Sequence, residues 1–257
     1  MASTRIENST PTEVERALAR KGQGGMADFA ALLSPCAGEN FLEPMARLAR
    51  SLTRRRFGNT IRLFAPLYLS NECTNVCDYC GFSLGNAIPR KTLTVPEMLR
   101  EAGVLKGHGF EHVLLVTGES GRKVGVDYIL DALRALRRYF ANLSIEVQPL
   151  RTTEYERLVE EGLHAVMLYQ ETYERESYAA HHLKGKKRNF EWRLEAPDRL
   201  GRAGVNKIGL GCLYGLTRDW RTDAWFAGLH LDYLEKKYWR TLYSMSFPRI
   251  RPHEGES

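Results

Sequence analysis

Short apolar runs alternate with amphipathic stretches along most of the chain after about residue 63. Runs with the length and composition of buried strands cover residues 64–70, 112–117, 145–148, 166–170, 208–213 and 243–247. Helical patterns lie between them, and the clearest places Ile129, Leu133, Leu136 and Phe140 on one face. Strands that alternate with helices predict a parallel sheet with right-handed crossovers, so the expected fold class is α/β.

The first 60 residues show no strand-like run and carry apolar residues at helical spacing. A helix is expected over residues 43–53, and the glycine-rich stretch 22–25 reads as a loop. We therefore expect two parts, an N-terminal helical extension over residues 1–60 and an α/β domain over residues 61–257. Two Thr-x-x-Glu sequences, at Thr94 and Thr153, predict capped helix starts within the second part.

Polar side chains lie where the predicted strands end. They are Glu119, Gln148, Gln170, Glu171, Arg249 and Arg251. In a βα barrel the carboxyl ends of the strands form one rim, and that rim holds the active site. Because six strands cannot close the usual eight-stranded barrel, the pattern predicts a partial (βα)6 barrel of the TIM type, open between its first and sixth strands.

Composition and charge exclude several classes of protein. The 257 residues are 43% hydrophobic and 26% charged, which is typical of a globular protein, and the net charge is +6. The one tight arginine run, residues 54–56, has no interleaved aromatic residues, so we expect no nucleic-acid partner. No apolar run approaches the roughly 20 residues of a membrane helix, and no signal peptide is evident, which favours a cytoplasmic protein without membrane contact.

Three of the five cysteines, Cys73, Cys77 and Cys80, fall within eight residues in the spacing C-x3-C-x2-C, directly after the first predicted strand. A structural zinc site uses four closed ligands, whereas three thiolates leave one iron of a four-iron cluster open for another ligand. A zinc-stabilised scaffold without catalysis remains the alternative. Cys36 and Cys212 lie apart from this group, and we expect both to be unreactive.

The cysteine spacing, with Tyr79 before the last cysteine, resembles the signature of the radical S-adenosylmethionine (SAM) enzymes. The resemblance implies a radical SAM-type barrel with a 4Fe-4S cluster on Cys73, Cys77 and Cys80. It also implies SAM as a second cofactor, chelated at the fourth iron, with the backbone around Tyr79 facing the adenine.

Further cofactor-binding residues follow from the same resemblance. Gly118 and Glu119 match the motif that holds the amino group of SAM. Arg193 is implied as the partner of the SAM carboxylate, because a guanidinium binds a carboxylate in bidentate fashion. Arg199 is a competing candidate, and a surface salt bridge of Arg193 with Glu195 or Asp198 is the alternative without a cofactor.

Two more segments resemble cofactor contacts of the family. The glycine-rich stretch 209–215 resembles the segment that contacts adenine, which implicates Gly211 and Leu213. Gln148 and Glu171, at neighbouring strand ends, are expected to face the SAM ribose or the substrate. The run HHLKGKK over residues 181–187 reads as a metal or phosphate loop or as a solvated lid, and we favour the lid.

A finer resemblance extends from residue 67 to residue 252. The runs VTGE, EVQPL, YQETY, PDRLGRAG and SFPRIRP look like 2-iminoacetate synthase, the tyrosine lyase of thiamine biosynthesis. That family cleaves the Cα–Cβ bond of L-tyrosine to give 2-iminoacetate (dehydroglycine) and p-cresol. The resemblance implies tyrosine contacts from Gln170, Tyr173 and either Arg249 or Arg251, an electron donor such as flavodoxin, and thiazole synthase as the recipient of the product.

Two alternatives accompany this interpretation. The tyrosine lyase of hydrogenase maturation shares the YQETY and PRIRP runs. Members of the 2-iminoacetate synthase family continue past PRIRP, so the chain resembles a C-terminally truncated member, and an inactive fragment that still binds a cluster is the second alternative.

Overall fold

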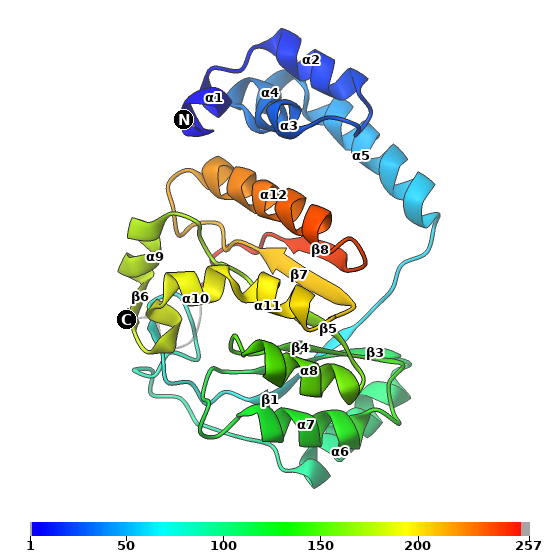
Figure 1. Ribbon diagram of the computed structural model, residues 1–257, viewed down its shortest axis with the longest axis vertical. Helices are drawn as coiled ribbons and strands as arrows, with labels where there is room; N and C mark the ends of the chain where they lie inside the picture. Colours follow the sequence, from blue (N-terminus) through cyan, green and yellow to red (C-terminus); the bar gives the residue numbers. More distant parts are fainter. Residues whose placement is uncertain (1, 253–257) are drawn as a thin grey trace. The chain divides into compact units, whose positions relative to one another are not determined.

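A six-stranded parallel sheet forms the centre of the larger part of the chain in the computed structural model, which describes residues 2–252 (Figure 1). Its strands are β1 (Ala65–Ser70), β3 (His112–Thr117), β4 (Asn142–Glu146), β5 (Leu163–Met167), β7 (Lys207–Gly211) and β8 (Leu242–Ser246). The order is β1-β3-β4-β5-β7-β8, and every neighbouring pair is parallel. This confirms the predicted α/β fold on six parallel strands, with β1 and β8 at the edges.

Helices connect the strands, as expected for βα units. They are α6 (Val95–Gly107), α7 (Val126–Leu136), α8 (Thr152–Glu160), α9 (Arg175–His181), the 3-10 helix η1 (Lys186–Arg188), α10 (Phe190–Leu194), α11 (Ala196–Arg202) and α12 (Trp220–Lys237). Helices α6, α7, α8 and α11 follow one another along the sheet, each packed against the next (Figure 1). The predicted apolar stripe of α7 is confirmed, because Ile129, Leu133 and Leu136 are buried. No helix within residues 2–252 has the length and apolar character needed to cross a bilayer.

The N-terminal residues are helical, as predicted. They form α1 (Ala2–Glu7), α2 (Pro11–Ala19), α3 (Met26–Leu33), α4 (Pro35–Asn40) and α5 (Leu42–Phe57), around a small core that includes Val14, Ala31 and Ala37. Residues 1–62 and 218–232 form one compact unit, and residues 63–217 and 233–257 form the other. The domain boundary between residues 60 and 61 stays a prediction. No pattern in the sequence indicated that residues 218–232 group with the helical unit.

Two local expectations differ from the structure. Helix α6 has the predicted capping box at Thr94, but the box at Thr153 is wrong. Helix α8 begins two residues earlier than that box implies, because the Arg151 backbone N–H donates to the Glu154 carboxylate at 2.7 Å and so provides the cap. Strands β4 and β5 lie about three residues before their predicted positions, since polar residues occupy outward-facing sites at the start of β4. Gln148, Gln170 and Glu171 therefore belong to the loops that follow these strands.

A second sheet of only two short strands, β2 (Val76–Cys77) and β6 (His182–Lys184), was not predicted. The two strands pair antiparallel, which brings the cysteine segment against residues more than 100 positions later in the chain. Strands this short have no periodicity that a sequence pattern can reveal.

Candidate active site

The three clustered cysteines lie in the loop between β1 and α6, and the protein holds this loop at several points. The Cys77 N–H donates to Ser83 Oγ at 3.1 Å, and the Thr74 N–H donates to the carbonyl oxygen of Glu119 at 3.0 Å. The pairing of β2 with β6 fixes Cys77 itself. The loop is therefore shaped by β3 and β6 as well as by its own turns.

Two glycines let the neighbouring backbone approach the loop from two directions. A side chain at Gly118 would overlap the carbonyl oxygen of Glu72, immediately before Cys73. A side chain at Gly185, which has φ of 95°, would overlap the Asn75 side chain. The absence of a side chain at Gly118 therefore lets the backbone of the cysteine loop pack directly against the end of β3.

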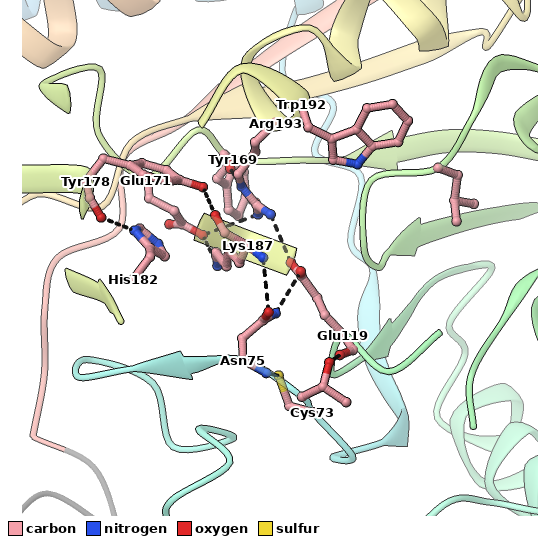
Figure 2. A network of polar contacts seen from close by, with 12 residues as sticks. Cys73, Asn75, Glu119, Tyr169, Glu171, Tyr178, His182, Lys187, Trp192 and Arg193 are labelled. Carbon is pink, nitrogen blue, oxygen red and sulfur yellow. Dashed lines mark hydrogen bonds and ion pairs between the residues drawn. The ribbon is translucent and has the colours of Figure 1, made fainter. Parts of the chain in front are cut away.

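A buried network of charges lies beside the loop, and its centre is Arg193 (Figure 2). The guanidinium donates from Nη1 to Glu119 Oε1 at 2.9 Å, from Nε to the Tyr169 carbonyl at 2.6 Å, and from Nη2 to Glu171 Oε1 at 3.4 Å. Glu119 also accepts from the amide of Asn75 at 2.9 Å, which connects the network to the cysteine loop.

A second cation, Lys187, was not among the residues predicted for the site. Its Nζ donates to Glu171 Oε1 at 2.7 Å and lies 5.6 Å from the centre of the Tyr79 ring. Glu171 has φ of 73°, a left-handed conformation that is unusual for a residue other than glycine. Strained backbone of this kind is concentrated at functional sites, where the surrounding structure holds it in place.

Burial and charge act in opposite directions on these carboxyl groups. Burial alone would raise the pKa of Glu119, but Arg193 and Lys187 hold that pKa below its ordinary value. The pKa of Glu171 is lowered against the effect of burial by the same two cations, with Lys187 the stronger. At Glu146, burial and the charge of Glu171 outweigh the effect of the same two cations, so its pKa is raised. Two ionised carboxylates thus share two cations beneath the cysteine loop.

The side chain of Tyr79 is held by His182. Nδ1 of His182 lies 2.6 Å from the Tyr178 carbonyl, which can only accept, so this nitrogen carries the proton. Nε2 then accepts from the Tyr79 hydroxyl at 2.8 Å. Burial lowers the pKa of His182 to about 4, which keeps the ring neutral. Within the run 181–187, interpreted as a solvated lid, residues 183–186 are exposed. His182 is buried and Lys187 contacts Glu171, so these two residues do not fit the lid interpretation.

The cysteines and the charge network line one cavity of about 340 Å³. Of the predicted residues, it brings together Cys73, Tyr79, Cys77, Cys80, Gly118, Glu119, Glu171 and Arg193. Thr117 also lines this cavity, and its buried hydroxyl has no hydrogen-bond partner within residues 2–252. An unpaired buried group in a cavity is a point at which a ligand can bind.

Other predicted residues lie outside this cavity lining. Gln148 lines a larger cleft of about 1370 Å³ that shares Glu119, Lys187 and Arg193 with the smaller cavity. Gln148 donates to the Val124 carbonyl at 2.9 Å, while its buried Oε1 finds no partner in the described part of the chain.

The remaining predicted contact residues lie at or after the ends of β5, β7 and β8. Gln170 is buried, and its Nε2 has no partner among residues 2–252, whereas Tyr173 is partly exposed. Gly211 packs directly on the β8 backbone at Ser246, and the Leu213 N–H donates to the Glu171 carbonyl at 2.8 Å. Both Arg249 and Arg251 are exposed beyond β8. Their roles toward a ligand stay predictions.

The structure separates the two candidate arginines. Arg199 donates from Nε to the Leu150 carbonyl at 2.9 Å and stacks on the Trp192 ring at 3.6 Å, so its contacts are structural. Arg193 points into the cavity and pairs with Glu119, which rules out the surface salt bridge with Glu195 or Asp198. The carboxylate of Asp198 instead binds Lys237 at 2.7 Å.

Across residues 2–252, no three His, Cys, Asp or Glu side chains are grouped so that they could bind one metal ion. This arrangement does not favour a zinc scaffold built on Cys73, Cys77 and Cys80. A four-iron cluster has a different requirement, because each thiolate binds a different iron and the sulfur atoms need not converge on one point.

Comparison with known proteins agrees with this geometry. The model of the Radical SAM superfamily matches residues 67–224. The 2-iminoacetate synthase of Escherichia coli (strain K12) is 54% identical over 251 residues, which cover 98% of this chain and 66% of that protein. The chain thus spans slightly less than two thirds of the length of this relative.

Two solved structures share the fold. The crystal structure of HydG, a maturase of the FeFe-hydrogenase, superposes with a TM-score of 0.92 at 31% identity and covers 98% of this chain and 57% of HydG. Methylornithine synthase (PylB) has a TM-score of 0.75 at 23% identity, over 93% of this chain and 69% of that one, and shows the fold alone.

We expect Gly118→Ala to displace the cysteine loop, because the new methyl group would overlap backbone atoms of Glu72 that cannot rotate away. The variant should bind clearly less iron per chain after anaerobic reconstitution and should lose roughly 1–3 kcal/mol of unfolding free energy. Gly121→Ala in the same connection is the matched control, since a methyl group there meets only the end of the Lys186 side chain. Equal iron content in the two variants would contradict the proposed packing.

Proposed function

Because this chain belongs to the radical SAM superfamily, whose members use a 4Fe-4S cluster and SAM, we propose that it is a carbon–carbon lyase that cleaves L-tyrosine to 2-iminoacetate and p-cresol. The observation that carries the proposal is the cavity in which three cysteines meet the oppositely charged Glu119 and Arg193. The 54% identity to a 2-iminoacetate synthase supports tyrosine as the substrate. HydG, which represents the alternative, is less similar at 31%.

The residues present fit both cofactors. Cys73, Cys77 and Cys80 would each hold one iron of the cluster and leave the fourth iron open. The amino acid part of SAM carries one ammonium and one carboxylate, and Glu119 and Arg193 offer the matching charges within one cavity. The cluster and SAM, when bound, supply the one-electron chemistry that starts a radical reaction.

The chain itself would orient these groups and limit the access of water. Asn75 and Thr74 fix the end of β3 to the cysteine loop, so Glu119 and the thiolates keep a constant spacing. The Tyr79 side chain is anchored on His182, which leaves the backbone around Tyr79 free to face an adenine ring. Thr117 offers a hydroxyl whose hydrogen-bonding capacity is still available within the cavity. Rigid supports of this kind are what a reactive intermediate requires.

Tyrosine recognition is assigned to the strand ends beyond the charge network. Gln170 and Tyr173 follow β5, and either Arg249 or Arg251 after β8 would bind the substrate carboxylate. The backbone of Arg249 pairs with Tyr214, which gives this position a fixed place on the sheet edge. An electron donor such as flavodoxin and a thiazole synthase that accepts the easily hydrolysed product complete the proposal.

Replacement of Cys73, Cys77 or Cys80 by Ala should abolish the cluster, because a four-iron cluster with an open iron already uses only three thiolates. Iron and sulfide content and the visible absorption of anaerobically reconstituted protein measure this. Cys36→Ala and Cys212→Ala serve as matched controls. Cys36 donates to the Ser9 carbonyl at 3.3 Å and Cys212 is fully buried in the core, so both variants should keep the cluster. Loss of iron in either control would show that the ligand assignment is wrong.

Glu119→Ala should weaken SAM binding and leave the cluster in place, because it removes a charge-assisted hydrogen bond to the SAM ammonium group. The expected loss is about 1.5–3 kcal/mol of binding free energy. Equilibrium titration of the reconstituted protein with SAM measures it. An unchanged dissociation constant would exclude this role for Glu119.

The lyase activity is tested by incubating the reconstituted chain with tyrosine, SAM and dithionite and measuring p-cresol and 5′-deoxyadenosine together. Both should form, and p-cresol should depend on tyrosine. Formation of 5′-deoxyadenosine without p-cresol would contradict the proposed tyrosine lyase activity, although it would still show that the chain cleaves SAM.

In the same assay Arg249→Lys or Arg251→Lys should raise the tyrosine concentration required for p-cresol formation, since lysine cannot reproduce a bidentate contact. If neither does, the carboxylate assignment fails.

A further inference from the structure

The guanidinium of Arg193 already uses all three of its nitrogen atoms. Nε donates to the Tyr169 carbonyl, Nη1 donates to Glu119, and Nη2 lies 3.4 Å from Glu171 (Figure 2). A carboxylate ligand that binds in bidentate fashion needs two N–H groups on one side of the guanidinium. Arg193 keeps two of its five N–H groups for such a ligand, but its single positive charge is already shared by two carboxylates, so a third carboxylate draws this charge away from Glu119 and Glu171.

Each of these carboxylates lies in the interior and then needs another cation, since a poorly paired charge there is strongly unfavourable. The relative exposures of the Glu119 and Glu171 side chains are 15% and 9%, so water cannot replace Arg193 fully at either position. An amino acid ligand brings its own ammonium group, which can satisfy Glu119. The amino acid part carries no second cation for Glu171.

Lys187 is placed to balance the negative charge of Glu171 without help from Arg193. Its ammonium contacts Oε1 of Glu171 at 2.7 Å, the same oxygen that Arg193 approaches at 3.4 Å. The Lys187 backbone N–H donates to Asn75 at 3.0 Å, so the lysine is held by the cysteine loop independently of Arg193. Its side chain is 11% exposed, and its position in η1 follows Gly185, which packs on the same Asn75.

We propose that Lys187 is a positioning residue that takes over the charge of Glu171 when the carboxylate of a bound amino acid cofactor engages Arg193. The proposal rests on the assignment of SAM to this cavity. Lys187 then raises the affinity for SAM without touching it, because it lowers the free energy needed to draw the charge of Arg193 away from Glu171. Without Lys187, Glu171 competes with the cofactor carboxylate for the same guanidinium.

The test uses Lys187→Met, Glu171→Gln and the double variant, each reconstituted anaerobically and titrated with SAM at equilibrium, with iron content measured in parallel. Lys187→Met should bind SAM roughly tenfold more weakly or worse. The double variant should recover to within about threefold of Glu171→Gln, because the competing carboxylate is then neutral. Lys186→Met is the matched control, because Lys186 is the neighbouring residue and its side chain is exposed. This variant loses the same charge and should bind SAM as tightly as the unchanged chain does.

A purely structural role predicts a different pattern, in which the double variant stays as weak as Lys187→Met. That result, or binding by Lys187→Met within about threefold of the unchanged chain, would overturn the proposal. If Lys187→Met does not hold the cluster, Lys187→Arg decides, since it keeps the charge and should retain SAM binding. A loss of SAM binding in Lys187→Arg would overturn the proposal. Absence of SAM binding by the unchanged chain would instead contradict the proposed function, so the two failures are distinguishable.

Discussion

The site depends on keeping two carboxylates ionised in the interior of the protein. Glu119 and Glu171 are both buried, and burial disfavours their charged forms. Arg193 and Lys187 offset this effect at distances of 2.7–3.4 Å, and Asn75 supplies a further hydrogen bond to Glu119. Removal of either cation would leave a buried negative charge with one partner fewer, so the four charged groups have to be considered together.

The fold explains how these groups meet. Glu119 follows β3, Glu171 follows β5, Lys187 lies in η1 after β6, and Arg193 lies in α10. Because β3 and β5 are parallel, their carboxyl ends bring Glu119 and Glu171 to the same end of the sheet. The pairing of β2 with β6 brings the lysine segment against the cysteine loop. The large sheet therefore places the carboxylates, and the small antiparallel sheet connects one of the cations to the cysteines.

The sequence revealed the features that have a local signature. Short apolar runs located the six strands, and the C-x3-C-x2-C spacing located the cysteine site, because both depend on neighbouring residues. Lys187 could not be distinguished from Lys184 and Lys186 in the same run, since only the fold determines which of the three is buried. The left-handed conformation of Glu171 was equally hidden. Glutamate does not favour that conformation, and contacts with distant residues hold it there.

The contact of Gly118 and Gly185 with the cysteine loop has a consequence for protein engineering. A design that transplants only the three cysteines and their immediate neighbours into another scaffold would omit the surfaces that hold this loop in place. A transferable unit needs residues 72–83 together with residues 117–119 and 182–187, three segments separated by more than 30 residues in the chain. Two of its essential residues are Gly118 and Gly185, because a side chain at either position would overlap atoms of the cysteine loop.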